Sequence, residues 1–361
     1  MTVETKTDVP GGRRGRLVDA LFSGLAIPAL PLALRADRTW SERHQKALIR
    51  YYRAAGAGGV AVGVHSTQFA IREPRHGLFR PLLDLAARVI RGESGRGAGP
   101  FLGIAGVCGD TPQAIREIRL AAELGYDAAL VSLAALNKQP IADLIEHCRA
   151  LAEILPIIGF YLQPAVGGRV LPIGFWREFA QMEGAVAIKM APFNRYQTLD
   201  VVRAVAESGR EDLALYTGND DNIVADLLTP WTFGGKTLFI RGGLLGQFGV
   251  WTKAAVEWLE KIKAARTSDT LAADWWTLNA AWTDANAAIF DAAHGFSGCI
   301  PGIHEVLHRQ GLLPSIACLD PEETLSPGQA EEITRVARAY PQLTDDAFVR
   351  EHRDAWLEEG A

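Results

Sequence analysis

Cysteine is scarce in this sequence, and the few cysteines form no pattern. The 361 residues include four of them, Cys108, Cys148, Cys299 and Cys318, which stand far apart and form no C-x-x-C pair. Their spacing relative to the eight histidines also lacks the rhythm of a metal site. We therefore expect reduced, mostly structural thiols and no bound metal.

An excess of positive charge is also absent, and so is any long hydrophobic run. The formal net charge of −5 provides no basic field for nucleic acid and no polybasic patch for a membrane. No apolar run approaches the length of a membrane span, and the N-terminal segment lacks the apolar core of a signal peptide. The sequence therefore predicts a cytoplasmic globular protein without nucleic-acid or membrane partners, whose expected ligands are small molecules.

Eight short apolar runs alternate with amphipathic segments that begin near Ser, Thr or Pro and often end at Gly. The runs are 25–30, 59–64, 101–106, 128–133, 157–162, 185–190, 213–218 and 237–242. Continuous apolar strands that are each followed by a helix indicate parallel pairing with both sheet faces covered. The predicted fold is α/β, a (β/α)8 TIM barrel with a C-terminal helical extension.

Three regions are expected along the chain: a flexible N-terminal tail over 1–15, the barrel over 16–250 and a C-terminal helical region over 251–361. The last region carries several large aromatic residues, namely Trp275, Trp276, Trp282 and Phe290. Exposed tryptophans in that number would form an adhesive patch. We therefore expect this region to pack on the barrel and on a partner subunit, in a homo-oligomer.

A lysine interrupts the sixth apolar run. Lys189 follows the segment 185–188 at the predicted C-terminal end of a strand, the end at which such barrels carry their active sites. An amine among apolar neighbours loses hydration, so its pKa falls and it becomes a nucleophile that forms a Schiff base with a carbonyl compound. The alternative is a lysine that reaches solvent or pairs with an acid.

Further candidates follow neighbouring strands. Tyr161 ends the fifth run, where its phenol would relay protons beside Lys189, or else serve only as a core residue with a structural partner. His65 follows the second run, as a general acid or base that titrates near physiological pH or as a wall residue. Asp220 and Asp221 are interpreted as a cap of the following helix rather than as metal ligands.

The segments GFYLQP and AVAIKMA resemble the fifth- and sixth-strand signature of the dihydrodipicolinate synthase and N-acetylneuraminate lyase superfamily. In that family a Tyr-x-x-Pro element precedes an Ile-Lys element, and here Tyr161 and Lys189 are 28 residues apart, a spacing similar to that of the synthases. The segments 215–228 and 290–314 also resemble family elements. The resemblance implies a Schiff-base lyase without an organic cofactor, with Lys189 and Tyr161 as catalytic residues, and a tetramer built from dimers.

Departures from the family pattern argue against dihydrodipicolinate synthase itself. Val64 and His65 stand where the family has a threonine pair, and neither the second tyrosine after strand four nor the arginine after the Tyr-x-x-Pro element is present. The residues that we expect to contact the substrate are His65, Ser66, Thr67, Gly218, Asn219 and Gly242.

The functional hypothesis is therefore a Schiff-base class I aldolase or lyase that acts on a 2-oxo acid such as pyruvate. A hydro-lyase (dehydratase) that acts on a 2-oxo sugar acid through the same iminium chemistry is the first alternative. A phosphate-binding barrel enzyme without a Schiff base would instead use the glycines of IRGGLLG (240–246). A non-catalytic ligand-binding barrel is the last alternative.

Overall fold

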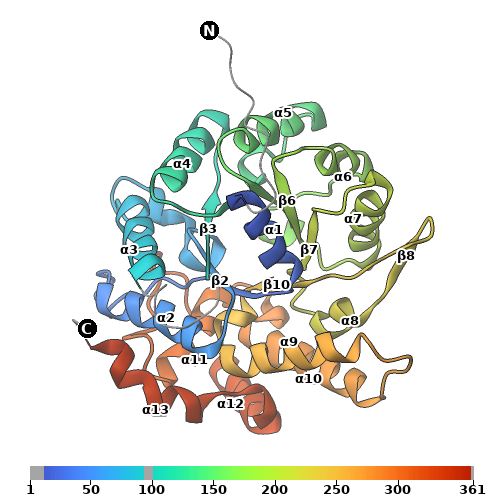
Figure 1. The fold of residues 1–361 in the computed structure, drawn as a ribbon. Helices are drawn as coiled ribbons and strands as arrows, with labels where there is room; N and C mark the ends of the chain where they lie inside the picture. Colours follow the sequence, from blue (N-terminus) through green and yellow to red (C-terminus); the bar gives the residue numbers. More distant parts are fainter. Residues whose placement is uncertain (1–11, 93–100, 359–361) are drawn as a thin grey trace.

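Eight parallel strands form one sheet in the order β1-β10-β7-β6-β5-β4-β3-β2, and a parallel bridge between Ala29 and Ala61 brings its two edges together (Figure 1). The computed structural model describes residues 12–92 and 101–358. The barrel strands are β1 (Ala26–Pro28), β2 (Gly59–Val62), β3 (Leu102–Val107), β4 (Ala128–Val131), β5 (Ile157–Leu162), β6 (Ala185–Ala191), β7 (Ala214–Thr217) and β10 (Gly242–Leu245). The predicted (β/α)8 barrel is confirmed.

Helices follow the strands and cover the outside of the barrel. They are α2 (Glu42–Ala55), α3 (Phe79–Gly92), α4 (Thr111–Glu123), α5 (Ile141–Ala152), α6 (Ile173–Ala180), α7 (Arg195–Ser208), α8 (Ile223–Leu228) and α9 (Thr252–Ala265). Side chains cap some of them: Asp110 accepts a hydrogen bond from Gln113 N–H at the start of α4. Helix α9 packs against α2 and β1, so the barrel runs to residue 265 and the expected boundary at 250 cuts off its last helix.

Short 3₁₀ helices occupy several loops. They are η1 (His65–Thr67), η2 (Phe69–Arg72), η3 (Ala134–Leu136), η4 (Pro164–Val166), η5 (Gln247–Gly249), η6 (Ala292–His294) and η7 (Pro341–Leu343). Four of them, η1, η3, η4 and η5, follow barrel strands within two residues. The backbone therefore turns sharply at this end of the barrel.

The strands separate two apolar layers. Side chains alternate along a strand, so Ile158 and Phe160 of β5 fill the barrel interior, whereas Ile157 and Tyr161 pack outward beneath the helices. Only the residues of a strand that face the barrel interior can therefore reach a central cavity.

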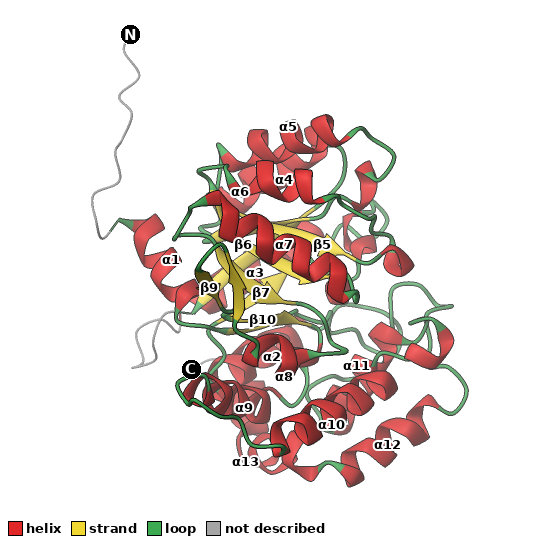
Figure 2. Cartoon of the chain, turned by 90° about the vertical axis from the view of Figure 1, so that its right-hand side faces the viewer, coloured by secondary structure: helices red, strands yellow, loops and turns green. Residues whose placement is uncertain are grey.

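A short helix closes the amino-terminal end of the barrel. Leu17 and Leu21 of α1 (Arg13–Phe22) join the interior cluster, and the hydroxyl of Tyr216 donates to the carbonyl of Leu21 at 2.7 Å. Figure 2 shows α1 and α11 at opposite ends of the molecule. The helix begins inside the tail predicted over 1–15, and residues 1–11 of that tail lie outside the described residues.

The predicted eighth strand, 237–242, is wrong. Residues within it belong to an antiparallel hairpin of β8 (Trp231–Phe233) and β9 (Lys236–Leu238), whereas the barrel strand β10 starts at Gly242. Glycine stands there because any side chain on Gly242 would overlap the backbone of Leu25 in the neighbouring strand segment. A run that looks like a turn is thus a strand packed too closely for side chains.

Four helices form the C-terminal region beside the barrel, coloured gold to red in Figure 1. They are α10 (Asp274–Ile289), α11 (Cys299–Arg309), α12 (Gln329–Ala339) and α13 (Asp346–Leu357). Trp282 is buried in the shared core, and the hydroxyl of Tyr51 on α2 donates to Asp345 at 2.7 Å. Packing on the barrel is thus confirmed, while the contact with a partner subunit stays a prediction.

One aromatic residue of this region is not covered within the monomer. Trp276 on α10 is 53% exposed.

None of the helices in the described ranges combines the length and the apolar character that crossing a lipid bilayer requires.

Candidate active site

A cavity of about 100 Å³ lies between the carboxyl ends of the strands and the C-terminal region. A single buried water needs roughly 10–15 Å³ by the same measure, so the cavity admits a small organic molecule. The barrel contributes His65, Ser66, Phe160, Lys189, Gly218, Asp220 and Gly246, and the C-terminal region contributes Phe290, Phe296, Cys299 and Ile303. The lining is therefore mostly apolar, with a few convergent polar groups.

Lys189 extends from β6 into this cavity, where the sequence predicted it. Only 9% of the residue is exposed, and within the described parts of the chain its amine makes neither an ion pair nor a hydrogen bond. Nζ instead lies over the ring of Phe160, 4.4 Å from its centroid, in a cation–π contact. Burial lowers the pKa of Lys189 to about 8, against the opposing effect of the negative charge on Asp220.

Gly218 leaves room for the lysine. A Cβ atom added at this position would lie 2.6 Å from Cε of Lys189 and 2.9 Å from Cβ of Ala191. The backbone of Gly218 is fixed by its N–H, which donates to the carbonyl of Met190 at 2.6 Å. Absence of a side chain, rather than direct recognition of a ligand, explains the glycine.

Asp220 is a second ionisable group in the cavity lining, and sequence reasoning assigned it to a helix cap. The cap of α8 is instead Asn222. Asn286 donates to the backbone carbonyl of Asp220 at 2.7 Å and so fixes the backbone beneath the carboxylate. Burial raises the pKa of Asp220 to about 7, although the charge of Lys189 acts in the opposite direction.

The loop after β2 brings two of its three candidates into the cavity. His65 and Ser66 line it, whereas Thr67 is buried behind them and donates to the carbonyl of Leu30 at 2.7 Å. Burial, and secondarily the charge of Lys189, lowers the pKa of His65 to about 4. The imidazole is therefore neutral at pH 7, which corrects the expectation of a group that titrates near physiological pH.

Tyr161 does not line the cavity, contrary to the sequence-based expectation. Its ring packs outward against Trp176 at 5.2 Å between centroids. Its hydroxyl accepts the N–H of Leu171 at 3.2 Å and donates to the carbonyl of the same residue at 3.3 Å. The phenol is thus fully engaged in a structural role.

A β-bulge explains why the 28-residue spacing misleads. Ile157 pairs with Ala185, but the next pair is Ile158 with Ala187, so β6 carries one extra residue. An unbroken ladder would set Tyr161 opposite Lys189, whereas the bulge sets Phe160 there. A shift of one residue along a strand exchanges the inward and outward faces, and a phenylalanine therefore contacts the lysine.

Two more candidates lie outside the cavity lining. The side chain of Asn219 is buried, accepts the N–H of Phe193 at 3.0 Å and donates to Asp226 at 2.9 Å. Gly242 begins β10 and lies a strand length from the cavity, which Gly246 reaches instead. The eighth strand was placed too early in the sequence, so the glycine at its carboxyl end was missed.

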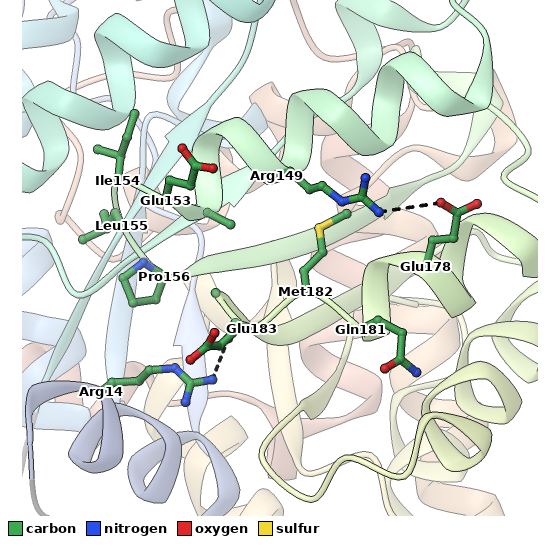
Figure 3. A pocket seen from close by; sticks show the side chains of 12 residues that line it. Arg14, Arg149, Glu153, Ile154, Leu155, Pro156, Glu178, Gln181, Met182 and Glu183 are labelled. Carbon is green, nitrogen blue, oxygen red and sulfur yellow. Dashed lines mark hydrogen bonds and ion pairs between the residues drawn. The ribbon is translucent and has the colours of Figure 1, made fainter. Parts of the chain in front are cut away.

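A second, wider hollow of about 570 Å³ lies at the opposite end of the barrel (Figure 3). Pro156 and Gly184 line it, and these residues directly precede β5 and β6. Arg14 donates to the carbonyl of Glu183 at 2.7 Å, and Arg149 lies 4.0 Å from the carboxylate of Glu178. The amino-terminal face of such barrels serves stability, so the smaller cavity around Lys189 is the candidate active site.

The fold and the site define a (β/α)8 barrel with an amine at the carboxyl end of its sixth strand. Residues 101–237 match the model of the dihydrodipicolinate synthetase family. A 4-hydroxy-tetrahydrodipicolinate synthase of Alkaliphilus oremlandii is 34% identical over 34% of this chain and 41% of its own length. One from Bifidobacterium longum is 25% identical over 56% of this chain and 63% of its own length.

Solved structures of similar proteins superpose on a larger share of this chain than the curated sequences cover. A dihydrodipicolinate synthase of Thermotoga maritima superposes with a TM-score of 0.71 at 17% identity, over 89% of this chain and 99% of that one. A prophage protein of Escherichia coli K12, solved in complex with pyruvate, gives a TM-score of 0.69 at 18% identity, over 90% and 99% of the two chains. The chain therefore shares the fold of these structures, and residues 101–237 are similar to the dihydrodipicolinate synthetase family.

The position of Tyr161 yields a first prediction. Replacing Tyr161 with Phe removes two hydrogen bonds to Leu171 and should lower the free energy of unfolding by about 1–2 kcal/mol. The labelling rate of Lys189 by an amine-directed reagent, followed by mass spectrometry, should stay within about twofold of wild type, because the phenol lies outside the cavity. Phe160→Leu, which removes the ring beside Nζ, is the comparison that should change this rate. A tenfold change in the Tyr161→Phe variant alone would contradict the assigned register.

Proposed function

We propose that this protein is a Schiff-base lyase that acts on a 2-oxo acid such as pyruvate. The observation that carries the proposal is the Lys189 amine, which is buried at a barrel strand end without an ion-pair partner among the described residues. Burial lowers the pKa of this amine and so raises the share of it that is neutral near pH 7. Only the neutral form adds to a ketone carbon.

The chemistry follows from that amine. Nζ of Lys189 adds to the ketone carbon of the substrate, and loss of water gives an iminium ion that attracts electrons. A proton then leaves the neighbouring carbon, and the resulting enamine attacks an aldehyde; the reverse sequence cleaves the same carbon–carbon bond. The iminium nitrogen stays beside Phe160, whose ring face favours a positive charge.

Asp220 is the group that we assign to proton transfer. The family tyrosine is absent from the cavity, while this carboxylate lines it together with Lys189. A pKa raised to about 7 allows the group both to take and to return a proton near neutral pH. His65 is neutral there and offers a polar ring nitrogen without competing for the proton.

The substrate carboxylate is assigned to the loop after β2. Among the described residues no acceptor is found for the backbone N–H groups of His65 and Ser66. Both residues line the cavity, and backbone N–H groups bind carboxylate oxygens well. This arrangement replaces the side-chain hydroxyls of the usual threonine pair, which the sequence lacks.

The relatives support the class of chemistry rather than one substrate. The chain spans 41% of the Alkaliphilus synthase and 63% of the Bifidobacterium one, and those proteins are named for dihydrodipicolinate chemistry. The E. coli neighbour was solved with pyruvate. Because this chain lacks the arginine and the second tyrosine of the synthases, we assign the first substrate to the pyruvate type and the second to a different class.

The phosphate-binding alternative loses its support. Gly242 and Gly243 lie within β10, where added side chains would overlap Leu25 and Phe248. Close packing therefore accounts for these glycines. The cavity lining contains no arginine and no lysine besides Lys189. It therefore offers few positive charges to offset the cost of removing a phosphate group from water.

Covalent trapping tests the proposal directly. Incubation with pyruvate followed by borohydride reduction should attach the substrate to Lys189, as mapped by peptide mass spectrometry. Lys189→Arg should abolish the adduct, because the guanidinium keeps its charge and is not a nucleophile. Lys138→Arg, at an exposed lysine, is the matched control and should trap normally. Failure to trap any member of a broad 2-oxo acid panel would refute the Schiff-base mechanism.

Proton exchange tests the role of Asp220. Formation of the enamine exchanges the methyl protons of pyruvate for solvent deuterium, which NMR follows without knowledge of the second substrate. Asp220→Asn should slow this exchange by about 10²- to 10⁴-fold, since the amide cannot accept the proton, while the reduced adduct on Lys189 still forms. Asp221→Asn, at the exposed neighbouring acid, should leave exchange near the wild-type rate. Equal exchange in both variants would assign the proton to another group.

A further inference from the structure

Two phenylalanines at the cavity hold an unusual backbone conformation. Phe193, in the loop after β6, has φ 50°, and Phe296, in the loop between η6 and α11, has φ 69°. Bulky residues rarely adopt this left-handed region, because Cβ crowds the backbone there. Such conformations persist where the surrounding structure imposes them, and they gather at functional sites.

Separate hydrogen-bond systems hold each of the two residues. The N–H of Phe193 donates to the buried side chain of Asn219 at 3.0 Å. The N–H of Phe296 donates to the carbonyl of Asp291 at 3.0 Å. The carboxylate of Asp291 in turn accepts from the N–H of Gly298 at 3.0 Å and from the hydroxyl of Ser326 at 2.5 Å. Both loops are therefore fixed from beneath by buried polar groups.

The two rings meet across the cavity, and we call them the aromatic pair. Their centroids are 5.8 Å apart and their planes are inclined by 57°. Both residues line the cavity of Lys189 and both are only half-buried, whereas the lysine is almost fully enclosed. The aromatic pair is thus a more exposed part of the cavity lining than the amine, with one ring from the barrel and one from the C-terminal region.

The remaining lining is apolar and poor in cations. Phe160, Phe290, Leu162 and Ile303 add further hydrocarbon surface. The ionisable side chains of the lining are Lys189, Asp220, His65 and Cys299. Lys189 is occupied by the first substrate, His65 is neutral, and Asp220 carries no positive charge in either protonation state. A second carboxylate or phosphate would therefore be desolvated without a partner.

We propose that the second reactant is an uncharged aldehyde with an aromatic or bulky apolar group, and that this group packs against the aromatic pair of Phe193 and Phe296. The inference rests on the proposed function, whose second substrate it specifies. Aromatic rings stack favourably on other aromatic rings in inclined or offset geometry. The held backbone conformations present both rings before a ligand arrives, which reduces the entropy lost on binding.

The step balances without an additional cofactor. The enamine carbon of the lysine-bound pyruvate forms the new bond to the aldehyde carbon, and the aldehyde π electrons move to oxygen, which takes the proton held by Asp220. Water then adds to the iminium carbon and releases Lys189. The product is a 4-hydroxy-2-oxo acid that carries the apolar group, and in the cleavage direction the same bond breaks.

A substrate panel tests this inference in the full-length protein. With pyruvate present, kcat/KM is measured for benzaldehyde, acetaldehyde and the anionic aldehyde glyoxylate, with product identified by mass spectrometry. Wild type should prefer benzaldehyde to each of the others by at least about tenfold. Phe296→Ala should lower the ratio of benzaldehyde to acetaldehyde by about tenfold or more, and Phe296→Leu by less. Phe233→Ala, a half-buried phenylalanine of the β8–β9 hairpin outside the cavity, is the matched control and should leave the ratio unchanged.

The outcomes separate this inference from the proposed function. Trapping of pyruvate on Lys189 together with a preference for glyoxylate would overturn the apolar second substrate and leave the Schiff-base lyase standing. An unchanged selectivity ratio in Phe296→Ala would likewise overturn the role of the aromatic pair. Absence of any adduct on Lys189 would overturn the proposed function and this inference together.

Discussion

The removal of one amine from water is the constraint on which the rest of the site depends. A lysine in water has a pKa near 10.4, and burial in this cavity lowers that of Lys189 to about 8. The barrel achieves this by several simple means: β6 carries the side chain inward, Gly218 leaves space beside it and Phe160 covers Nζ with a ring. A carboxylate paired directly with the amine would cancel the effect, and Asp220 lines the cavity without forming an ion pair with it.

The C-terminal region forms part of the candidate active site as well as packing on the barrel. Phe290, Phe296 and Cys299 close the cavity over the strand ends, and without them the amine would be hydrated. The same region packs on α2 through the hydrogen bond between Tyr51 and Asp345. Packing of these helices on the barrel therefore helps to enclose the cavity that holds the lysine.

The sequence predicted the barrel, seven of its strands and the position of Lys189, because continuous apolar runs and strand ends are local features. The sequence-based prediction placed Tyr161 beside the lysine, where the structure has Phe160. The cause is a bulge between Ile157 and Ile158, which changes the register and leaves no local signal in the sequence. The prediction missed β10 because a glycine pair resembles a turn. It also treated Asp220 as a cap, since only the folded loop after β7 reveals that this carboxylate, and not Asn219, lines the cavity.

The most direct test of this account is the pKa of Lys189 itself. Trace acetylation of the native protein across a series of pH values, with each lysine quantified by mass spectrometry, reports the protonation of individual amines. The account predicts a midpoint close to 8 for Lys189, well below the ordinary value for a lysine in water. A midpoint near the ordinary 10.4 would show that the amine is hydrated, and it would remove the basis for covalent chemistry at this site.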